Sequence, residues 1–226
     1  MNKKIVIAGN SVGVRIRPFE SGDSSYSDLL RREHNGLVNL CASGEMIGTF
    51  SLHSDKIIRE KPDVVILQFG IVELSSRSTS RALYNYLHYR AKRTSFGAFV
   101  KHIINGVESK LRSVLVHLGF KRSWYRTSRF LKEYEFLVSQ LTNNSDARVI
   151  CMGVNIPNDR VEKQLPGSRK RVTKANEALQ EISKKYTECY FIDVNHFGSE
   201  NYPDGIHYSA KGHREVLDSI LELMKD

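Results

Sequence analysis

The feature that most constrains the fold is an alternation of short apolar, β-branched runs with segments of helical periodicity. The apolar runs are predicted strands at residues 4–8, 37–41, 64–69, 148–153 and 190–194. Helical spacing of apolar side chains occurs at residues 23–34, 171–186 and 210–224. Because such alternation is typical of βαβ units, the sequence predicts an α/β fold with a parallel sheet.

The length of the chain bounds the number of domains. With 226 residues, 40% of them hydrophobic, it can build one α/β domain with a sizeable core but is short for two. We therefore expect a single domain over residues 1–226. The longest apolar runs are far shorter than the roughly 20 residues that span a bilayer, and residues 5–8 are too short for a signal peptide. We expect a cytoplasmic protein without a transmembrane helix.

Residues 75–143 interrupt the alternation of strands with helix-like, aromatic and basic sequence. Between residues 75 and 135 there are thirteen Lys or Arg and three acidic residues, whereas the whole chain carries a net charge of +9. We predict a basic helical insertion after the third strand, folded as a lid. Trp124, Tyr125 and Phe130 are candidates for apolar contacts to a substrate or a neighbouring subunit.

The concentrated charge suggests acidic partners. An acidic polysaccharide, a membrane surface or a partner subunit would suit such a face, and binding to it would weaken with added salt. A nucleic acid is not expected as the main partner, because no recognised nucleic-acid motif accompanies the charge. The same segment also fits a solvated charged surface.

Four of the predicted strands end near a glycine, at Gly9, Gly44, Gly70 and Gly153. Ligands of open parallel sheets bind beyond the carboxyl ends of the strands, so these loops should share one rim. Ser11 lies in the first loop, in a Gly-x-Ser-x-Gly pattern. That pattern also marks the nucleophile of α/β-hydrolases, but here it follows the first strand and no His-Gly-Gly-Gly stretch is present. Taken alone, it equally fits a simple turn.

A second motif, Asp204-Gly205-Ile206-His207, precedes the last predicted helix. A nucleophilic serine needs a base to accept its proton, and that base needs a carboxylate to fix its tautomer. Asp204 and His207 can supply both groups from one turn. An isolated pair of this kind also occurs in ordinary turns.

Together the two ends of the chain resemble the SGNH/GDSL hydrolase family. The family's conserved blocks follow successive strand ends, in the order found here. They correspond to Gly9-Asn10-Ser11, to Gly44, to Gly70-Ile71-Val72-Glu73, and to Asp204 with His207. The resemblance covers the chain outside the insertion.

The resemblance implies a flavodoxin-like three-layer sandwich with a five-stranded parallel sheet of order 2-1-3-4-5. It further implies that Ser11 attacks an acyl carbonyl, that His207 shuttles the proton and that Asp204 orients His207. The backbone N–H groups of Ser11 and Gly44 would hold the oxyanion. Neither a metal nor an organic cofactor is implied.

Two positions depart from the family's pattern. Asn10 replaces an aspartate and keeps the ability to form hydrogen bonds. Val72 replaces an asparagine whose side chain donates to the oxyanion, and valine has no such donor. Asn155, after the fourth strand, is a candidate for the third donor. It also fits a turn before Pro157.

The function expected from this pattern is a serine esterase or deacylase. It would act through an acyl-enzyme on a small acyl ester, with a carbohydrate as the expected alcohol. One alternative is an O-acyltransferase for a surface polysaccharide, which would use the same three side chains. Another is a catalytically inactive binding module, which the loss of the asparagine at position 72 favours and the retention of Ser11, Asp204 and His207 opposes.

Overall fold

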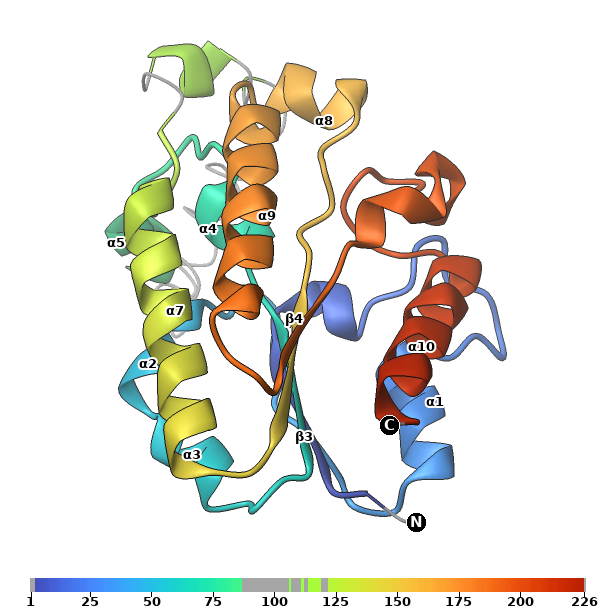
Figure 1. Cartoon of the computed structure of the whole chain (residues 1–226). Helices are drawn as coiled ribbons and strands as arrows, with labels where there is room; N and C mark the ends of the chain where they lie inside the picture. The colour runs from blue at the N-terminus through green and yellow to red at the C-terminus, as the bar shows by residue number, and fades with distance from the viewer. Residues whose placement is uncertain (1–2, 87–105, 107–110, 112–113, 119–121, 226) are drawn as a thin grey trace.

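The computed structural model describes residues 3–86, 106, 111, 114–118 and 122–225 (Figure 1). Its centre is a five-stranded parallel sheet with the order β2-β1-β3-β4-β5, which confirms the predicted fold. The strands are β1 Ile5–Gly9, β2 Leu37–Asn39, β3 Val64–Gln68, β4 Arg148–Met152 and β5 Cys189–Ile192.

Helices cover both faces of the sheet, as Figure 1 shows. The helices α1 and α10 pack against each other on one face, and α7 packs with α2, α3 and α9 on the other. The α-helices are α1 Tyr26–Glu33, α2 Ile47–Leu52, α3 Ser54–Ile58, α4 Ile71–Leu74, α5 Arg81–Asn85, α7 Thr127–Asn144, α8 Asp159–Gln164, α9 Ser168–Lys184 and α10 Ala210–Met224. Within the described ranges, the 3-10 helices are η1 Ser11–Gly13, η4 Val194–Phe197 and η5 Ser199–Asn201.

Burial explains why the strands read as continuous apolar runs. Every residue of β1 and β3 is buried, because these strands lie inside the sheet with helices on both sides. The two strands are in register from Ile5 opposite Val64 to Gly9 opposite Gln68. Their carboxyl ends therefore lie side by side, and the loops that follow them meet at one rim.

The predicted insertion divides into two parts where it is described. Its last part forms α7, whose buried side chains pack on the sheet as the crossover helix between β3 and β4. Ser76 and Ser123 form an antiparallel bridge, and the Arg77 N–H donates to the Arg122 carbonyl at 2.8 Å. These contacts join the two ends of the intervening segment. Most of that segment, including residues 87–105, lies outside the described residues.

Two of the aromatic residues expected to contact a substrate lie in the core. Tyr125 is 2% exposed and Phe130 is fully buried, so neither is available for that role, and this expectation was wrong. Helical spacing of apolar side chains predicts that one face of a helix is covered, but it does not predict whether the protein's own core, a substrate or another subunit covers that face. In the part of the chain that the structure describes, every helix is too short or too polar to cross a bilayer.

Candidate active site

Ser11 lies immediately beyond the carboxyl end of β1, where it begins η1. The preceding residue, Asn10, caps η1 with its side-chain oxygen, which accepts a hydrogen bond from the Val12 N–H at 3.1 Å. Asn10 is 1% exposed and Ser11 is 8% exposed. The asparagine thus retains a structural hydrogen bond at this position and holds the backbone that presents Ser11.

Asp204 and His207 lie on the loop before α10, and this loop reaches across to Ser11. The Ser11 Oγ is 3.2 Å from His207 Nε2, and His207 Nδ1 is 2.8 Å from Asp204 Oδ2. These distances form a continuous hydrogen-bonded chain from hydroxyl to imidazole to carboxylate. With Nδ1–H donating to Asp204, Nε2 is the acceptor that faces the Ser11 hydroxyl.

The loop is shaped by the carboxylate itself. Asp204 Oδ1 accepts hydrogen bonds from the backbone N–H groups of Ile206 at 2.8 Å and His207 at 2.7 Å. Gly205 between them has φ +78, and a Cβ there would lie 2.7 Å from the Asn158 side chain. A glycine is therefore required at this turn for both conformation and space.

The same hydrogen bonds determine the charge of Asp204. Its partial burial acts to raise its pKa, but the bonds from the His207 ring and from two backbone N–H groups outweigh burial and lower the pKa to about 2. Asp204 is therefore ionised at neutral pH. A fixed negative charge beside Nδ1 stabilises a positive imidazole ring when Nε2 accepts a proton.

Gly44 brings a second backbone donor close to Ser11. Both residues line one cavity of about 210 Å³, and Gly44 has φ +77. Among the hydrogen bonds between described residues, the backbone N–H groups of Ser11 and Gly44 donate none. Neither N–H group is therefore engaged by another described residue, as the expected role of oxyanion donor requires.

The cavity is lined by both apolar and polar residues. The larger apolar and aromatic residues are Ile71, Val72, Tyr84, Trp124, Leu165 and Ile206. The other described residues that line it are Ser11, Ser43, Gly44, Ser75, Arg77 and His207. Tyr84 and Trp124 both belong to the predicted insertion, so part of it lies at the rim beside Ser11.

Asn155 is close to the loop of His207 but is not among the described residues that line the cavity. Its Nδ2 donates to the Ile206 carbonyl at 2.6 Å, and Asn155 is 3% exposed. In this arrangement the amide holds the residue before His207. To serve as an oxyanion donor, Asn155 would have to break its hydrogen bond to the Ile206 carbonyl or donate the second N–H of its amide to the oxyanion.

Glu73 links the two loops that flank Ser11, a role that sequence reasoning did not assign. Its carboxylate accepts hydrogen bonds from the Ile47 N–H at 2.7 Å and the Gly70 N–H at 3.0 Å. Glu73 is fully buried, and this burial raises its pKa to about 7 although the two N–H groups lower it. The sequence offers one indication of this role, because Glu73 is an acidic residue that follows Gly70-Ile71-Val72 directly after a buried strand.

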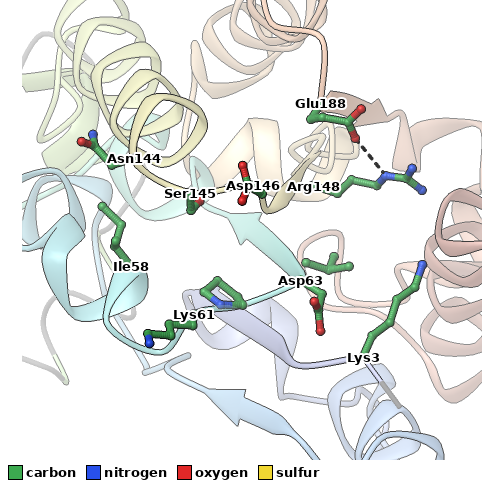
Figure 2. A pocket seen from close by; sticks show the side chains of 11 residues that line it. Lys3, Ile58, Lys61, Asp63, Asn144, Ser145, Asp146, Arg148 and Glu188 are labelled. Carbon is green, nitrogen blue, oxygen red and sulfur yellow. Dashed lines mark hydrogen bonds and ion pairs between the residues drawn. The ribbon is translucent and has the colours of Figure 1, made fainter. Parts of the chain in front are cut away.

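A larger hollow of about 600 Å³ lies at the amino ends of the strands (Figure 2). Figure 2 shows the ion pair between Arg148 and Glu188 on its wall, with the two groups 3.4 Å apart. No histidine is among the described residues that line it, so it offers no imidazole base to a serine. The chemistry is therefore placed in the smaller cavity at the carboxyl ends.

Comparisons with known proteins identify the family and agree with the fold. The family model for the GDSL-like lipase/acylhydrolase family matches residues 8–215, whereas no curated protein matches the chain. An acetylxylan esterase of Geobacillus stearothermophilus has a similar structure, with a TM-score of 0.60, 16% identity, and coverage of 98% of this chain and 93% of that one. A lipase/acylhydrolase of Enterococcus faecalis gives a TM-score of 0.65, 16% identity, and coverage of 99% and 95%.

Proposed function

Because this chain belongs to the GDSL-like lipase/acylhydrolase family and is an esterase by class, we propose that it removes a small acyl group from a carbohydrate ester through an acyl-enzyme on Ser11. The observation that carries the proposal is the chain of contacts from Ser11 Oγ through His207 to Asp204, at 3.2 and 2.8 Å. The sugar as alcohol is supported by the acetylxylan esterase of similar fold.

In the first half of the reaction, Ser11 Oγ attacks the ester carbonyl and its proton passes to His207 Nε2. Asp204, ionised and bonded to Nδ1, stabilises the imidazolium. The tetrahedral intermediate then collapses, and the alcohol leaves with the proton from Nε2. An acyl group remains on Ser11.

In the second half, a water molecule gives its proton to Nε2 and attacks the acyl-enzyme. The second tetrahedral intermediate expels Ser11 Oγ, which regains a proton, and the carboxylic acid departs. The backbone N–H groups of Ser11 and Gly44 are the donors for the oxyanion in both halves. Asn155 remains a candidate for the third donor, and the oxyanion would compete with the Ile206 carbonyl for its amide N–H.

The size of the cavity fits a short acyl group. Its volume of about 210 Å³ is below the roughly 300 Å³ at which pockets for drug-sized ligands begin. The aliphatic side chains of Ile71, Val72 and Leu165 provide an apolar surface for a methyl or similar group. A long fatty acyl chain would exceed this space.

The test is release of acetate from 4-nitrophenyl acetate and from acetylated sugars by wild type and Ser11→Ala. Wild type should turn over both, and Ser11→Ala should reduce turnover to background. Wild-type activity in Ser11→Ala would exclude Ser11 as the nucleophile. If an added sugar acceptor becomes acylated at the expense of free acetate, the acyl-enzyme serves transfer instead of hydrolysis.

A further inference from the structure

The last residue of β3 is a buried glutamine that the reaction steps above do not use. The strand reads Val-Val-Ile-Leu-Gln, and Gln68 is its one polar side chain. Burial of an amide is costly unless its N–H and C=O groups form hydrogen bonds. Gln68 therefore needs partners inside the protein.

Two buried tyrosines provide these partners. The Tyr26 hydroxyl of α1 donates to Gln68 Oε1 at 2.7 Å, and Gln68 Nε2 donates to the Tyr208 hydroxyl at 2.8 Å. Both tyrosine side chains are fully buried. The three side chains form a hydrogen-bonded chain from α1 through β3 to the loop before α10. Buried polar networks of this kind fix the positions of the groups that they join.

The main chain of Gln68 holds the loop of the nucleophile. Its carbonyl accepts a hydrogen bond from the Asn10 N–H at 3.1 Å, and Asn10 directly precedes Ser11. A Cβ at Gly13 would lie 3.0 Å from the Tyr26 hydroxyl and 3.1 Å from Gln68 Oε1. The second glycine of the Gly-x-Ser-x-Gly pattern thus lets η1 pack directly on the bond between Tyr26 and Gln68.

The side chain of Gln68 holds the loop of the base. Tyr208 directly follows His207, and its carbonyl accepts a hydrogen bond from the Arg17 N–H at 2.9 Å. Its ring packs edge-on against His213, with the ring centroids 5.1 Å apart. With its hydroxyl bonded to Gln68, Tyr208 is fixed at both its main chain and the tip of its side chain. The backbone beside His207 is consequently anchored to the end of β3.

We propose that Gln68 is a positioning residue that sets the distance between Ser11 and His207. Its carbonyl holds the residue before the nucleophile, and its amide holds the residue after the base. A shift of about 1 Å in a catalytic group costs on the order of 100-fold in rate, so the 3.2 Å contact between Ser11 Oγ and His207 Nε2 depends on this link. Neither Gln68 nor Tyr208 is among the described residues that line the cavity. The role rests on the function proposed above.

Two variants break the link with little change in side-chain volume. Tyr208→Phe removes the hydroxyl that accepts from Gln68, and Gln68→Met removes both of the amide's hydrogen bonds. We expect each to lower kcat for 4-nitrophenyl acetate by about 10- to 100-fold. Because the residues that line the cavity are unchanged, kcat/KM should fall by the same factor and KM should not change. A kcat equal to that of wild type in either variant would overturn the proposal.

Tyr134→Phe is the matched control. It removes another fully buried tyrosine hydroxyl, which donates to the carbonyl of Leu67, the neighbour of Gln68 in β3, at 3.2 Å. This variant should lower the melting temperature as Tyr208→Phe does, and it should leave kcat unchanged at a temperature well below unfolding. A loss of kcat as large as that in Tyr208→Phe would contradict the proposal, because it would show that any lost hydroxyl of the core lowers turnover.

Gln68→Glu gives a pH profile that a purely structural role does not produce. A protonated carboxyl has the shape of the amide, and it can accept from Tyr26 with one oxygen and donate to Tyr208 with its O–H. The ratio of the variant's kcat to that of wild type should be close to one at about pH 5.5 and fall as the carboxyl ionises. Gln68→Met should give a low ratio throughout. A ratio for Gln68→Glu as low as that for Gln68→Met at about pH 5.5 would refute the role assigned to the amide.

A final readout needs no turnover, so it separates this role from the esterase function. The His207 Nδ1 proton lies between His207 and Asp204, and its exchange with solvent is followed by proton NMR. Exchange should be faster in Tyr208→Phe than in wild type and in Tyr134→Phe. Faster exchange in a protein that turns over no ester would refute the esterase function alone. Equal exchange in an enzyme that turns over ester would refute the positioning role alone.

Discussion

Replacement of Asn155 by alanine separates two roles for a residue that lies between β4 and the His207 loop. The change removes the 2.6 Å bond to the Ile206 carbonyl and leaves that carbonyl without its donor, which costs about 1–3 kcal/mol. It also removes the unpartnered Asn155 Oδ1, so we expect the lower part of that range. For a protein of this size, about 1–2 kcal/mol lowers the melting temperature by roughly 2–8 °C.

Loss of this bond frees the residue beside His207, and a shift of about 1 Å in a catalytic group costs on the order of 100-fold. We therefore expect Asn155→Ala to lower kcat by about 10- to 100-fold together with the melting temperature. The assays are 4-nitrophenyl acetate turnover and thermal unfolding. Asn176→Ala, which removes amide bonds to Val154 from α9, is the stability reference.

The alternative role makes a different prediction. An oxyanion donor contributes about 2.7–4 kcal/mol to the transition state and nothing to the free protein. An unchanged melting temperature with a 100- to 1000-fold lower kcat would refute the positioning role and support Asn155 as the third donor. Unchanged turnover would exclude both roles.

Four further predictions test the site. Asp204→Asn should lower kcat/KM by up to about 10⁴-fold, because an amide facing Nδ1 favours the wrong histidine tautomer; a loss below 10-fold would contradict the assigned role. Val72→Asn should raise turnover if a donor position is unfilled, whereas a fall would show that Val72 shapes the acyl pocket. Because hydrogen bonds from His207 and from two backbone N–H groups lower the pKa of Asp204 to about 2, this carboxyl should stay ionised down to about pH 4; an NMR titration that gives the Asp204 carboxyl a midpoint above pH 4 would contradict this. Burial raises the pKa of Glu73 from 4.5 to about 7, so between these two pH values the folded protein holds a proton that the unfolded chain releases. The free energy of unfolding should therefore fall by about 3 kcal/mol as the pH rises through this range. Chemical denaturation at pH 4.5 and 7.5 should show this fall in wild type and not in Glu73→Gln.

Much of the fold was predictable because buried parallel strands have a strong local signature. Continuous β-branched runs placed all five strands within one or two residues of their observed ends. The strand order came from the family resemblance instead. What local sequence did not indicate was that α7 is a crossover helix, since its periodicity resembles that of the segment before it.

The site was predictable where a motif carried it. Ser11, Asp204 and His207 belong to short patterns, and the structure brings them together although Ser11 and His207 are 196 positions apart in the chain. The hydrogen-bond partner of Asn155 was not predictable, because its amide donates to a backbone carbonyl 51 residues away. Every residue has a backbone carbonyl, so the sequence does not indicate which one is the acceptor.

The central claim is that Ser11 is an activated nucleophile. The most direct measurement is the intact mass of the protein after treatment with a fluorophosphonate, followed by peptide mapping of the modified residue. We predict one adduct per chain, located on Ser11, absent from Ser11→Ala and formed far more slowly in His207→Ala. A folded wild-type protein that gains no adduct, or that is modified at a residue other than Ser11, would contradict the account.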